Sequence, residues 1–222
     1  MLTIFCGYDS REAVGFHTFC QSVIERATIP VSLIALSDSG AMQGSNQFTY
    51  SRFLVPYLMG YKGRAVFADA SDMLCLGDVK ELEIMLNLLD TAVGVVKHEY
   101  ETINPVKYIG TELECKNTNY LRKNWASLML IDCESQYWRI IEPNTLSAFS
   151  NLELLKLKFM PNNEITEIDD AWNRLVDEGQ PLEGAKLIHW TAGIPAFEHY
   201  KNAIGAELWK QAWANTKYPL AT

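Results

Sequence analysis

The chain has 222 residues, of which 48% are hydrophobic and 21% are charged. This composition excludes a disordered chain and suits one folded domain over residues 1–222. The net charge of −8 argues against general nucleic-acid binding, which needs a basic surface to displace counterions. No apolar run approaches the ~20 residues of a membrane-spanning helix, and the N-terminus lacks the basic region of a signal peptide. We therefore expect a cytoplasmic protein with no membrane span and no nucleic-acid partner.

Strands alternate with helices in the first half of the chain, according to the spacing of its apolar residues. The expected strands cover residues 2–6, 31–36 and 65–68, and the expected helices cover 11–26, 51–59 and 78–88. Gly60 ends the second helix, and the polar segment 37–46 is expected to be a loop. This alternation is typical of a sheet with a parallel core.

The second half of the chain is less regular. Further strands are expected over 92–96, 126–131 and 186–189, and further helices over 136–141, 144–155 and 198–214. The segment 99–122 has little periodicity and many polar residues. Long segments of this kind in compact domains are often functional. The whole pattern predicts an α/β fold with a mixed, Rossmann-like sheet flanked by helices.

The five cysteines are scattered along the chain without a CxxC pair. This usage predicts small, mostly buried hydrophobic side chains in a reducing compartment rather than a zinc site.

Two carboxylates, Asp69 and Asp72, follow the apolar strand that ends at Ala68. In such sheets ligands bind beyond the carboxyl ends of the strands. His189 ends another expected strand, and two carboxylates with an imidazole suit Mn²⁺ or Mg²⁺. An ordinary strand end with a turn aspartate is an alternative interpretation of the acids. His98 ends a strand at the same edge and is a weaker candidate ligand.

The first strand is followed by Gly7, Tyr8 and Asp9. A glycine there lets a nucleotide approach the backbone, a tyrosine can stack on a base, and an aspartate can accept from a ribose hydroxyl. Arg52 opens a helix and can pair with a carboxylate or a phosphate. The alternatives are an ordinary capped turn and a solvated arginine. No GxGxxG or P-loop motif is present.

Several ordered motifs make the pattern more specific. The segment SRFLVPYL at 51–58, then GYKG at 60–63 and the acidic strand end, resembles glycosyltransferases of the GT-A fold. It is closest to glycosyltransferase family 8 and a related bacterial and phage group. Further similar segments are IFCGYDSREA at 4–13, VKHEY at 96–100, RKNWASLML at 122–130, NEI at 163–165, WN at 172–173 and IHWTAGIP at 188–195.

The resemblance implies a GT-A domain that binds a nucleoside-diphosphate sugar as donor. By this resemblance Asp69, Asp72 and His189 hold the metal and Glu164 contacts the reacting sugar. Arg52 stabilises the departing diphosphate, and the other residues expected to contact the donor are Gly7, Tyr8, Asp9, Ser71 and Gly193. The chain departs from the family pattern in two ways. Two residues rather than one separate the aspartates, and no lysine follows the histidine motif, so Lys97 or Lys186 is expected to supply the cation for the phosphates.

The expected activity is therefore transfer of a hexose from a donor, UDP-linked by resemblance, to a hydroxyl of a glycan or another acceptor, with retention of configuration. Two alternatives stay open. One is a degenerate module that binds a nucleotide sugar without transfer, and the other is a sugar nucleotidyltransferase, although the glycine-rich loop of that class is missing. The segment 99–122 is the expected place for acceptor selectivity, since loops on a rigid scaffold usually set specificity.

Overall fold

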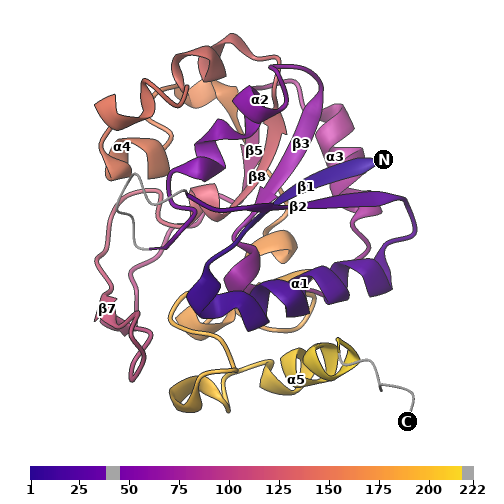
Figure 1. Ribbon diagram of the computed structural model, residues 1–222, viewed down its shortest axis with the longest axis vertical. Helices are drawn as coiled ribbons and strands as arrows, with labels where there is room; N and C mark the ends of the chain where they lie inside the picture. Colours follow the sequence, from indigo (N-terminus) through magenta and orange to yellow (C-terminus); the bar gives the residue numbers. More distant parts are fainter. Residues whose placement is uncertain (39–45, 217–222) are drawn as a thin grey trace.

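The structure is a computed structural model that describes residues 1–38 and 46–216. Its main element is a six-stranded sheet in the order β2-β1-β3-β8-β5-β9 (Figure 1). The strands are β1 (Leu2–Gly7), β2 (Val31–Leu36), β3 (Arg64–Ala68), β5 (Val93–Val95), β8 (Leu128–Asp132) and β9 (Ile165–Glu167). β8 is antiparallel to both of its neighbours, and the other pairs are parallel. The predicted mixed α/β sheet is confirmed, while the loop expected over 37–46 falls largely on residues 39–45, outside the described residues.

Helices cover both faces of this sheet because its strands alternate apolar side chains between two cores. The helices are α1 (Ala13–Arg26), α2 (Val55–Leu58), α3 (Lys80–Leu88) and α4 (Asn151–Leu155). On β3, Val66 joins the core against α1 and α3, whereas Phe67 joins the core against α2 and α4. The sheet is therefore buried on both faces, and its edges are the places left for a ligand.

A second sheet has three short strands in the order β10-β11-β4. They are β4 (Met73–Cys75), β10 (Arg174–Leu175) and β11 (Leu187–His189). The last helix, α5 (Ala206–Asn215), shares an apolar core with this sheet and contacts α1 (Figure 1). β11 pairs antiparallel with β4, so the chain near residue 189 returns to the segment that follows β3.

The segment 99–122 forms a hairpin of β6 (Val106–Lys107) and β7 (Cys115–Lys116) within a run of turns. Figure 1 shows β7 at the left margin of the view, away from the layered body of sheet and helices. Residue Tyr108, next to β6, returns to the body, where its N–H donates to the carbonyl of Ala192 at 2.6 Å.

The helix expected over 136–141 is a 3-10 helix, Gln136–Ile140, and the first part of the one expected over 51–59 is another, Ser51–Leu54. Two further expected helices are shorter than predicted. The helix predicted over 198–214 begins only at Ala206, because Gly205 adopts φ of 81° and separates it from a short 3-10 turn. The helix predicted over 144–155 is reduced to α4, which starts where Ser150 and Glu153 cap each other. The capping box sets the start of α4 against the apolar spacing, and the left-handed Gly205 interrupts the helix before α5.

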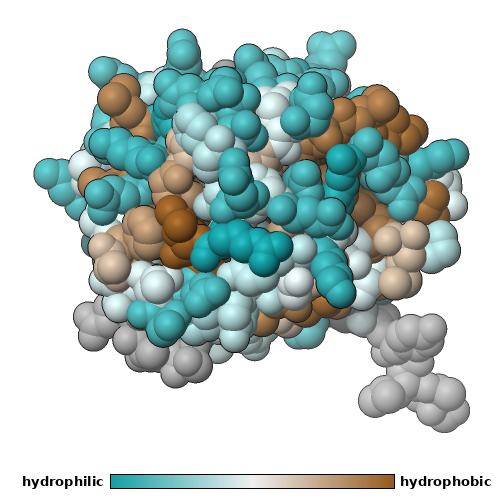
Figure 2. Space-filling model, turned by 90° about the horizontal axis from the view of Figure 1, so that it is seen from above, coloured by the Kyte–Doolittle hydropathy of each residue, from teal (hydrophilic) through white to brown (hydrophobic). Residues whose placement is uncertain are grey.

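The cysteines follow the expectation from their sequence contexts. All five are described and are free thiols, and three of them, Cys6, Cys75 and Cys133, are buried. The surface seen from above is mainly hydrophilic, with apolar side chains gathered in separate patches (Figure 2). Across residues 1–38 and 46–216, the helices are too short or too polar to cross a membrane.

Helix α1 touches the acidic turn at Gly15. A Cβ added there would lie 1.9 Å from the carbonyl oxygen of Ser71, which no rotamer change could relieve. Gly15→Ala is therefore expected to lower the free energy of unfolding by about 1–3 kcal/mol, although alanine in a helix interior normally gains about 1 kcal/mol over glycine. Urea denaturation measures the change. The matched control is Ile24→Ala on the exposed side of α1, and equal, small effects of both substitutions would contradict the contact.

Candidate metal and nucleotide site

The candidate ligands lie at one edge of the main sheet, the edge at which the parallel strands β1 and β3 end. Asp69 directly follows β3, and its N–H donates to the carbonyl of Ser127, just before β8, at 2.8 Å. Because β8 is antiparallel, its start lies at the same edge as the ends of β1, β3 and β5. This is the edge where ligands bind in open α/β sheets.

The two aspartates share one side of a single turn. Residues Ala70–Asp72 form a 3-10 helix with Asp69 at its N-terminus, and the N–H of Asp72 donates to the carbonyl of Asp69 at 3.1 Å. A 3-10 helix has 3.0 residues per turn, so side chains at i and i+3 align. The spacing of two intervening residues therefore keeps both carboxylates together.

His189 reaches the aspartates through the second sheet. β11 pairs with β4 so that His189 lies opposite Met73, and the N–H of Trp190 donates to the carbonyl of Asp72 at 3.0 Å. One oxygen of Asp69, one oxygen of Asp72 and one ring nitrogen of His189 lie within 4.8 Å of one another. The sequence-based grouping of these three residues is thus matched by their placement.

Asn173 orients the histidine. The Nδ1 of His189 lies 3.0 Å from the Oδ1 of Asn173, whose Nδ2 donates to the Oγ of Ser127 at 2.9 Å. Since the amide oxygen can only accept, the proton is on Nδ1 and Nε2 carries the free lone pair. Nε2 lies 3.4 Å from Asp72 Oδ1. This arrangement of a ligand histidine and an outer partner is typical of metal sites.

Arg52 is buried behind the acidic turn. Its Nη1 forms an ion pair with Asp69 Oδ1 at 2.7 Å and donates to the carbonyl of Ala126 at 2.9 Å. The guanidinium also lies over the rings of Phe48 and Phe67, at 5.2 and 5.1 Å from their centroids. Arg52 therefore fixes one candidate ligand in place and balances part of its charge.

Burial and like charge both act on the acids. Burial raises the pKa of Asp69 to about 6 although the Arg52 charge opposes this change. Burial alone would lower the pKa of His189, but the contact with Asp72 and the charges of Asp69 and Asp177 together outweigh it and raise that pKa. Glu12 is also buried, and burial together with the charge of Asp72 raises its pKa well above the usual range. The site concentrates more negative charge than Arg52 alone compensates, which favours a bound cation.

The donor set fits a divalent metal on two further observations. Asp72 Oδ1 is buried and accepts no hydrogen bond from any residue within 1–38 or 46–216. A buried polar atom left in this state costs about 1–3 kcal/mol, and a cation would satisfy it. Two carboxylate oxygens and one imidazole nitrogen suit Mn²⁺ or Mg²⁺.

The first loop is linked to the acidic turn through Ser71. The buried hydroxyl of Ser71 donates to the carbonyl of Gly7 at 3.2 Å and accepts from the N–H of Asp9 at 3.3 Å. Tyr8 packs edge-on against Phe16 with ring centroids 5.1 Å apart. The sequence placed Ser71 among the donor contacts, and the structure places it between the loop and the metal cluster.

Asp9 is occupied by the protein itself. Its fully buried carboxylate accepts from the backbone and guanidinium of Arg11 and from the N–H of Gln47. Burial alone would raise its pKa, but these hydrogen bonds outweigh burial and lower it. Asp9 thus holds the loop at Gln47 instead of presenting an open acceptor to a ribose.

Two glycines expected to contact the donor have aromatic neighbours. A Cβ on Gly7 would lie 2.5 Å from the ring of Phe48, and one on Gly193, where φ is 154°, would lie 2.4 Å from the ring of Tyr200. The space beside each glycine is filled by the protein, so both are required for local packing.

Glu164 is not brought to the cluster. It precedes β9, and its Oε2 accepts from the N–H of Ala92 at 3.2 Å, just before β5. The first residues of β5 and β9, Val93 and Ile165, pair with each other, and Val93 also pairs with Ile131 near the end of β8. The end of β8 in turn lies beside the start of β3, where Arg64 pairs with Asp132. Glu164 therefore lies at the edge of the sheet opposite Asp69, because β9 is parallel to β5 and starts at that edge.

The cavity at the cluster is small. It encloses about 70 Å³, and its lining includes residues that sequence reasoning missed, among them Lys107, Tyr108, Tyr120 and Asn124. A water molecule needs about 10–15 Å³ by this measure. The space therefore has room for a cation with a few waters but not for a nucleoside diphosphate.

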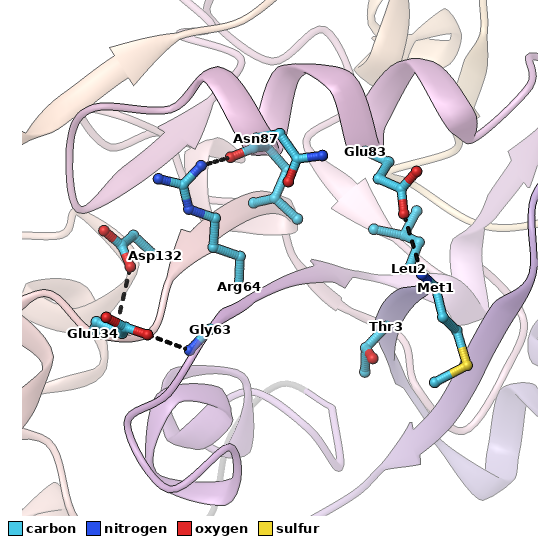
Figure 3. Close-up of a pocket in the computed structure, with 10 residues that line it drawn as sticks. Met1, Leu2, Thr3, Gly63, Arg64, Glu83, Asn87, Asp132 and Glu134 are labelled. Carbon is cyan, nitrogen blue, oxygen red and sulfur yellow. Dashed lines mark hydrogen bonds and ion pairs between the residues drawn. The ribbon is translucent and has the colours of Figure 1, made fainter.

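Two larger cavities lie elsewhere. One of about 710 Å³ lies between residues 98–101 and residues 119–123 with Trp125; we call it the aromatic cleft. Another of about 480 Å³ lies at the opposite edge of the main sheet, beside Arg64 and Glu134 (Figure 3). There Arg64 donates to the carbonyl of Leu86, and Glu134 accepts from the N–H of Gly63 (Figure 3). Since these charged groups already have partners, that cavity is not our candidate site.

Comparison with known proteins identifies the fold. No protein-family model matches the chain. The galactosyltransferase LgtC, solved with donor and acceptor sugar analogs, matches it with a TM-score of 0.64 and 13% identity over 99% of this chain and 98% of LgtC. The glycosyltransferase GlyE of Streptococcus pneumoniae matches with a TM-score of 0.59 and 13% identity over 97% of this chain and 62% of GlyE.

The sheet, its two helical layers and these structural matches define a GT-A fold, the fold of glycosyltransferases that was expected from the sequence. Protein CDI from Arabidopsis thaliana is 32% identical over 225 residues, covering 93% of this chain and 83% of that protein. The chain therefore belongs to the family of Protein CDI.

Proposed function

We propose that the chain is a metal-dependent glycosyltransferase that forms one catalytic domain and moves a hexose from a UDP-sugar to a hydroxyl acceptor, with retention of configuration. The observation that carries this proposal is the convergence of Asp69, Asp72 and His189 at the carboxyl edge of a GT-A sheet. These three side chains would hold Mn²⁺ or Mg²⁺. When bound, the cation would neutralise charge on the departing nucleoside diphosphate.

The protein groups around the cation have separate tasks in this proposal. Arg52 holds the carboxylate of Asp69, and Asn173 keeps the lone pair of His189 Nε2 pointed at the cluster. Tyr8 remains the candidate for stacking on the base, and Asp9 positions the loop that carries it. Glu164 is left out of the proposed site because of its place at the opposite edge.

The phosphate-binding cation is assigned to Lys107 in place of the two lysines expected from the sequence. Lys186 is paired with Glu81, and Lys97 lies over the ring of Trp125 at 5.7 Å. Lys107 lines the cavity of the cluster, and its charge acts on buried Glu12. Because Lys107 lines this cavity, a diphosphate that widens the cavity and binds at the cluster would lie beside the lysine.

Lys107→Ala is expected to weaken UDP binding about tenfold, the equivalent of about 1.4 kcal/mol, and to leave uridine binding unchanged, because only UDP carries phosphates. Calorimetry with manganese present measures both ligands. Lys116→Ala, which removes an exposed lysine from the same hairpin, is the matched control. Equal losses for UDP and uridine, or equal losses in both variants, would contradict the assignment.

A binding module without transfer activity is the second candidate. The placement of Glu164 favours it, since the acid expected beside the reacting sugar is at the other edge. Slow donor hydrolysis separates the two candidates, because a transferase leaks sugar to water and a binding module does not. We expect manganese-dependent release of hexose from one UDP-hexose, whereas tight UDP binding with no hydrolysis of any donor would favour the module.

A further inference from the structure

The aromatic cleft adjoins the candidate metal site. Tyr120 lines both the cleft and the small cavity at the cluster. His98, which lines the cleft, follows β5 at the same sheet edge where Asp69 follows β3. A ligand in the cleft would therefore lie beside the cluster, on the side away from β1 and the first loop.

The size and walls of the cleft suit a small organic ligand. Its volume of about 710 Å³ is within the range of about 300–1,000 Å³ typical of ligand pockets. Trp125 Nε1 donates to the carbonyl of His98 at 3.0 Å, and Tyr100 Oη accepts from Asn124 Nδ2 at 2.8 Å. These bonds fix two aromatic walls before any ligand arrives. Cations lie over both rings: Arg122 and Lys97 are 4.9 and 5.7 Å from the centroid of Trp125, and Lys123 is 5.9 Å from that of Tyr100. Where these cations leave a ring open, a fixed aromatic wall suits the C–H face of a sugar ring at low entropic cost.

His98 supplies an unused hydrogen-bond donor. The side chain is 6% exposed, and within the described residues its Nε2 has no hydrogen-bond partner. The Nε2 of Gln180 lies 3.5 Å from Nδ1 of His98 and can only donate, so the imidazole proton is on Nε2. Burial lowers the pKa of His98 to about 3, which keeps the ring neutral. Nε2 is covered in this structure, so a ligand oxygen in the cleft would satisfy this N–H after a small movement of the ring or of its neighbours.

The charges of the cleft favour an uncharged ligand. Lys123 Nζ donates to Asn117 Oδ1 at 2.6 Å, and Arg122 donates to the carbonyl of Lys156 and to Asn162. These partners are neutral, so both side chains keep their positive charge. Glu99 and Glu101, also in the lining, are exposed and negative, so the two acids balance the two cations and the cleft has no net charge to attract an ion.

We propose that the aromatic cleft is the acceptor subsite, that it takes an uncharged sugar ring, and that His98 Nε2–H donates to an oxygen of that ring. This inference rests on the proposed transferase function and names its acceptor class. His98 acts here as a specificity-determining residue, because a neutral N–H donor recognises an oxygen without removing a proton.

The experiment uses the full chain labelled with ¹⁵N-histidine, with UDP and manganese present and again without them. Methyl α- and β-glycosides of glucose, galactose, mannose and N-acetylglucosamine are titrated, with methyl glucuronide as the anionic counterpart. We expect at least one neutral glycoside to shift the Nε2 resonance of His98, and the glucuronide to bind about tenfold more weakly or not at all. The resonance is assigned with His98→Gln.

The variants test the role of the ring. His98→Leu is expected to weaken binding of that glycoside about tenfold, His98→Gln to restore part of it, and His199→Leu, at an exposed histidine, to leave it unchanged. UDP binding with manganese should be equal in all three variants, which separates this test from the proposed function. The inference is overturned if no neutral glycoside shifts the His98 resonance of the wild-type chain, or if His98→Leu binds the glycoside as well as wild type.

Discussion

Asp72→Asn is expected to abolish manganese-dependent binding of UDP. Asp72 Oδ1 is buried without a hydrogen bond within the described chain and lies 3.4 Å from His189 Nε2. A cation between these two atoms would therefore bind Asp72 directly. Replacing its charge by an amide is expected to reduce the apparent affinity for manganese by a factor of about 100 or more, beyond the 10–100-fold typical of partners outside the ligand shell. Calorimetry with UDP, with manganese or with a chelator, measures the loss.

The same substitution is expected to spare the fold. Asp72 lies close enough to raise the pKa of both Asp69 and Glu12, so its neutralisation relieves repulsion among buried acids. The free energy of unfolding should stay within about 1 kcal/mol of the wild-type value. Asp90→Asn, at an exposed acid, is the matched control. Unchanged manganese dependence in Asp72→Asn, or a parallel loss in Asp90→Asn, would argue against the metal cluster.

Arg52→Ala is expected to have the largest effect on stability. The side chains of Arg52 and Asp69 are 4% and 11% exposed and form an ion pair at 2.7 Å. Removing one partner of such a pair leaves an uncompensated charge and costs about 3–5 kcal/mol. The substitution also removes the hydrogen bond to Ala126 and the contacts with two aromatic rings. Urea denaturation at neutral pH measures the change.

The control for Arg52 is Arg139→Ala, an exposed arginine that also lies over an aromatic ring, 4.5 Å from the centroid of Tyr61. Its effect should stay within about 0.5 kcal/mol. Arg52→Lys should recover only part of the loss, because an ammonium group lacks the planar fork that pairs with Asp69 while stacking between rings. If Arg52→Ala and Arg139→Ala cost the same, the buried pair does not stabilise the fold as described.

The residues of the candidate metal cluster could be grouped from the sequence because each follows or ends an apolar strand. The spacing between the aspartates could be interpreted only with the backbone in view. Two residues rather than one separate Asp69 from Asp72, which departs from the family pattern. In a 3-10 turn this spacing aligns the two side chains. Strand β4, which brings His189 to them, is three residues long, too short for an apolar period to reveal.

The roles of other residues could not be predicted from the sequence. Asn173 lies in a segment similar to the family, but its contact with His189, 16 residues away, needs the fold. Lys107 reaches the cluster from a hairpin in a segment with little periodicity. Glu164 was assigned to the reacting sugar by resemblance to the family. The parallel pairing of β9 with β5 instead puts it at the sheet edge opposite Asp69. Such placements depend on strand direction and register, which the order of residue types does not encode locally.

The most direct test of the account is a crystal structure of the chain grown with manganese and UDP, with diffraction data collected at the manganese absorption edge. The account predicts one strong anomalous peak among the carboxylates of Asp69 and Asp72 and the Nε2 of His189, with the diphosphate of UDP beside it. A nucleotide bound elsewhere, or three side chains with no anomalous peak among them, would contradict it.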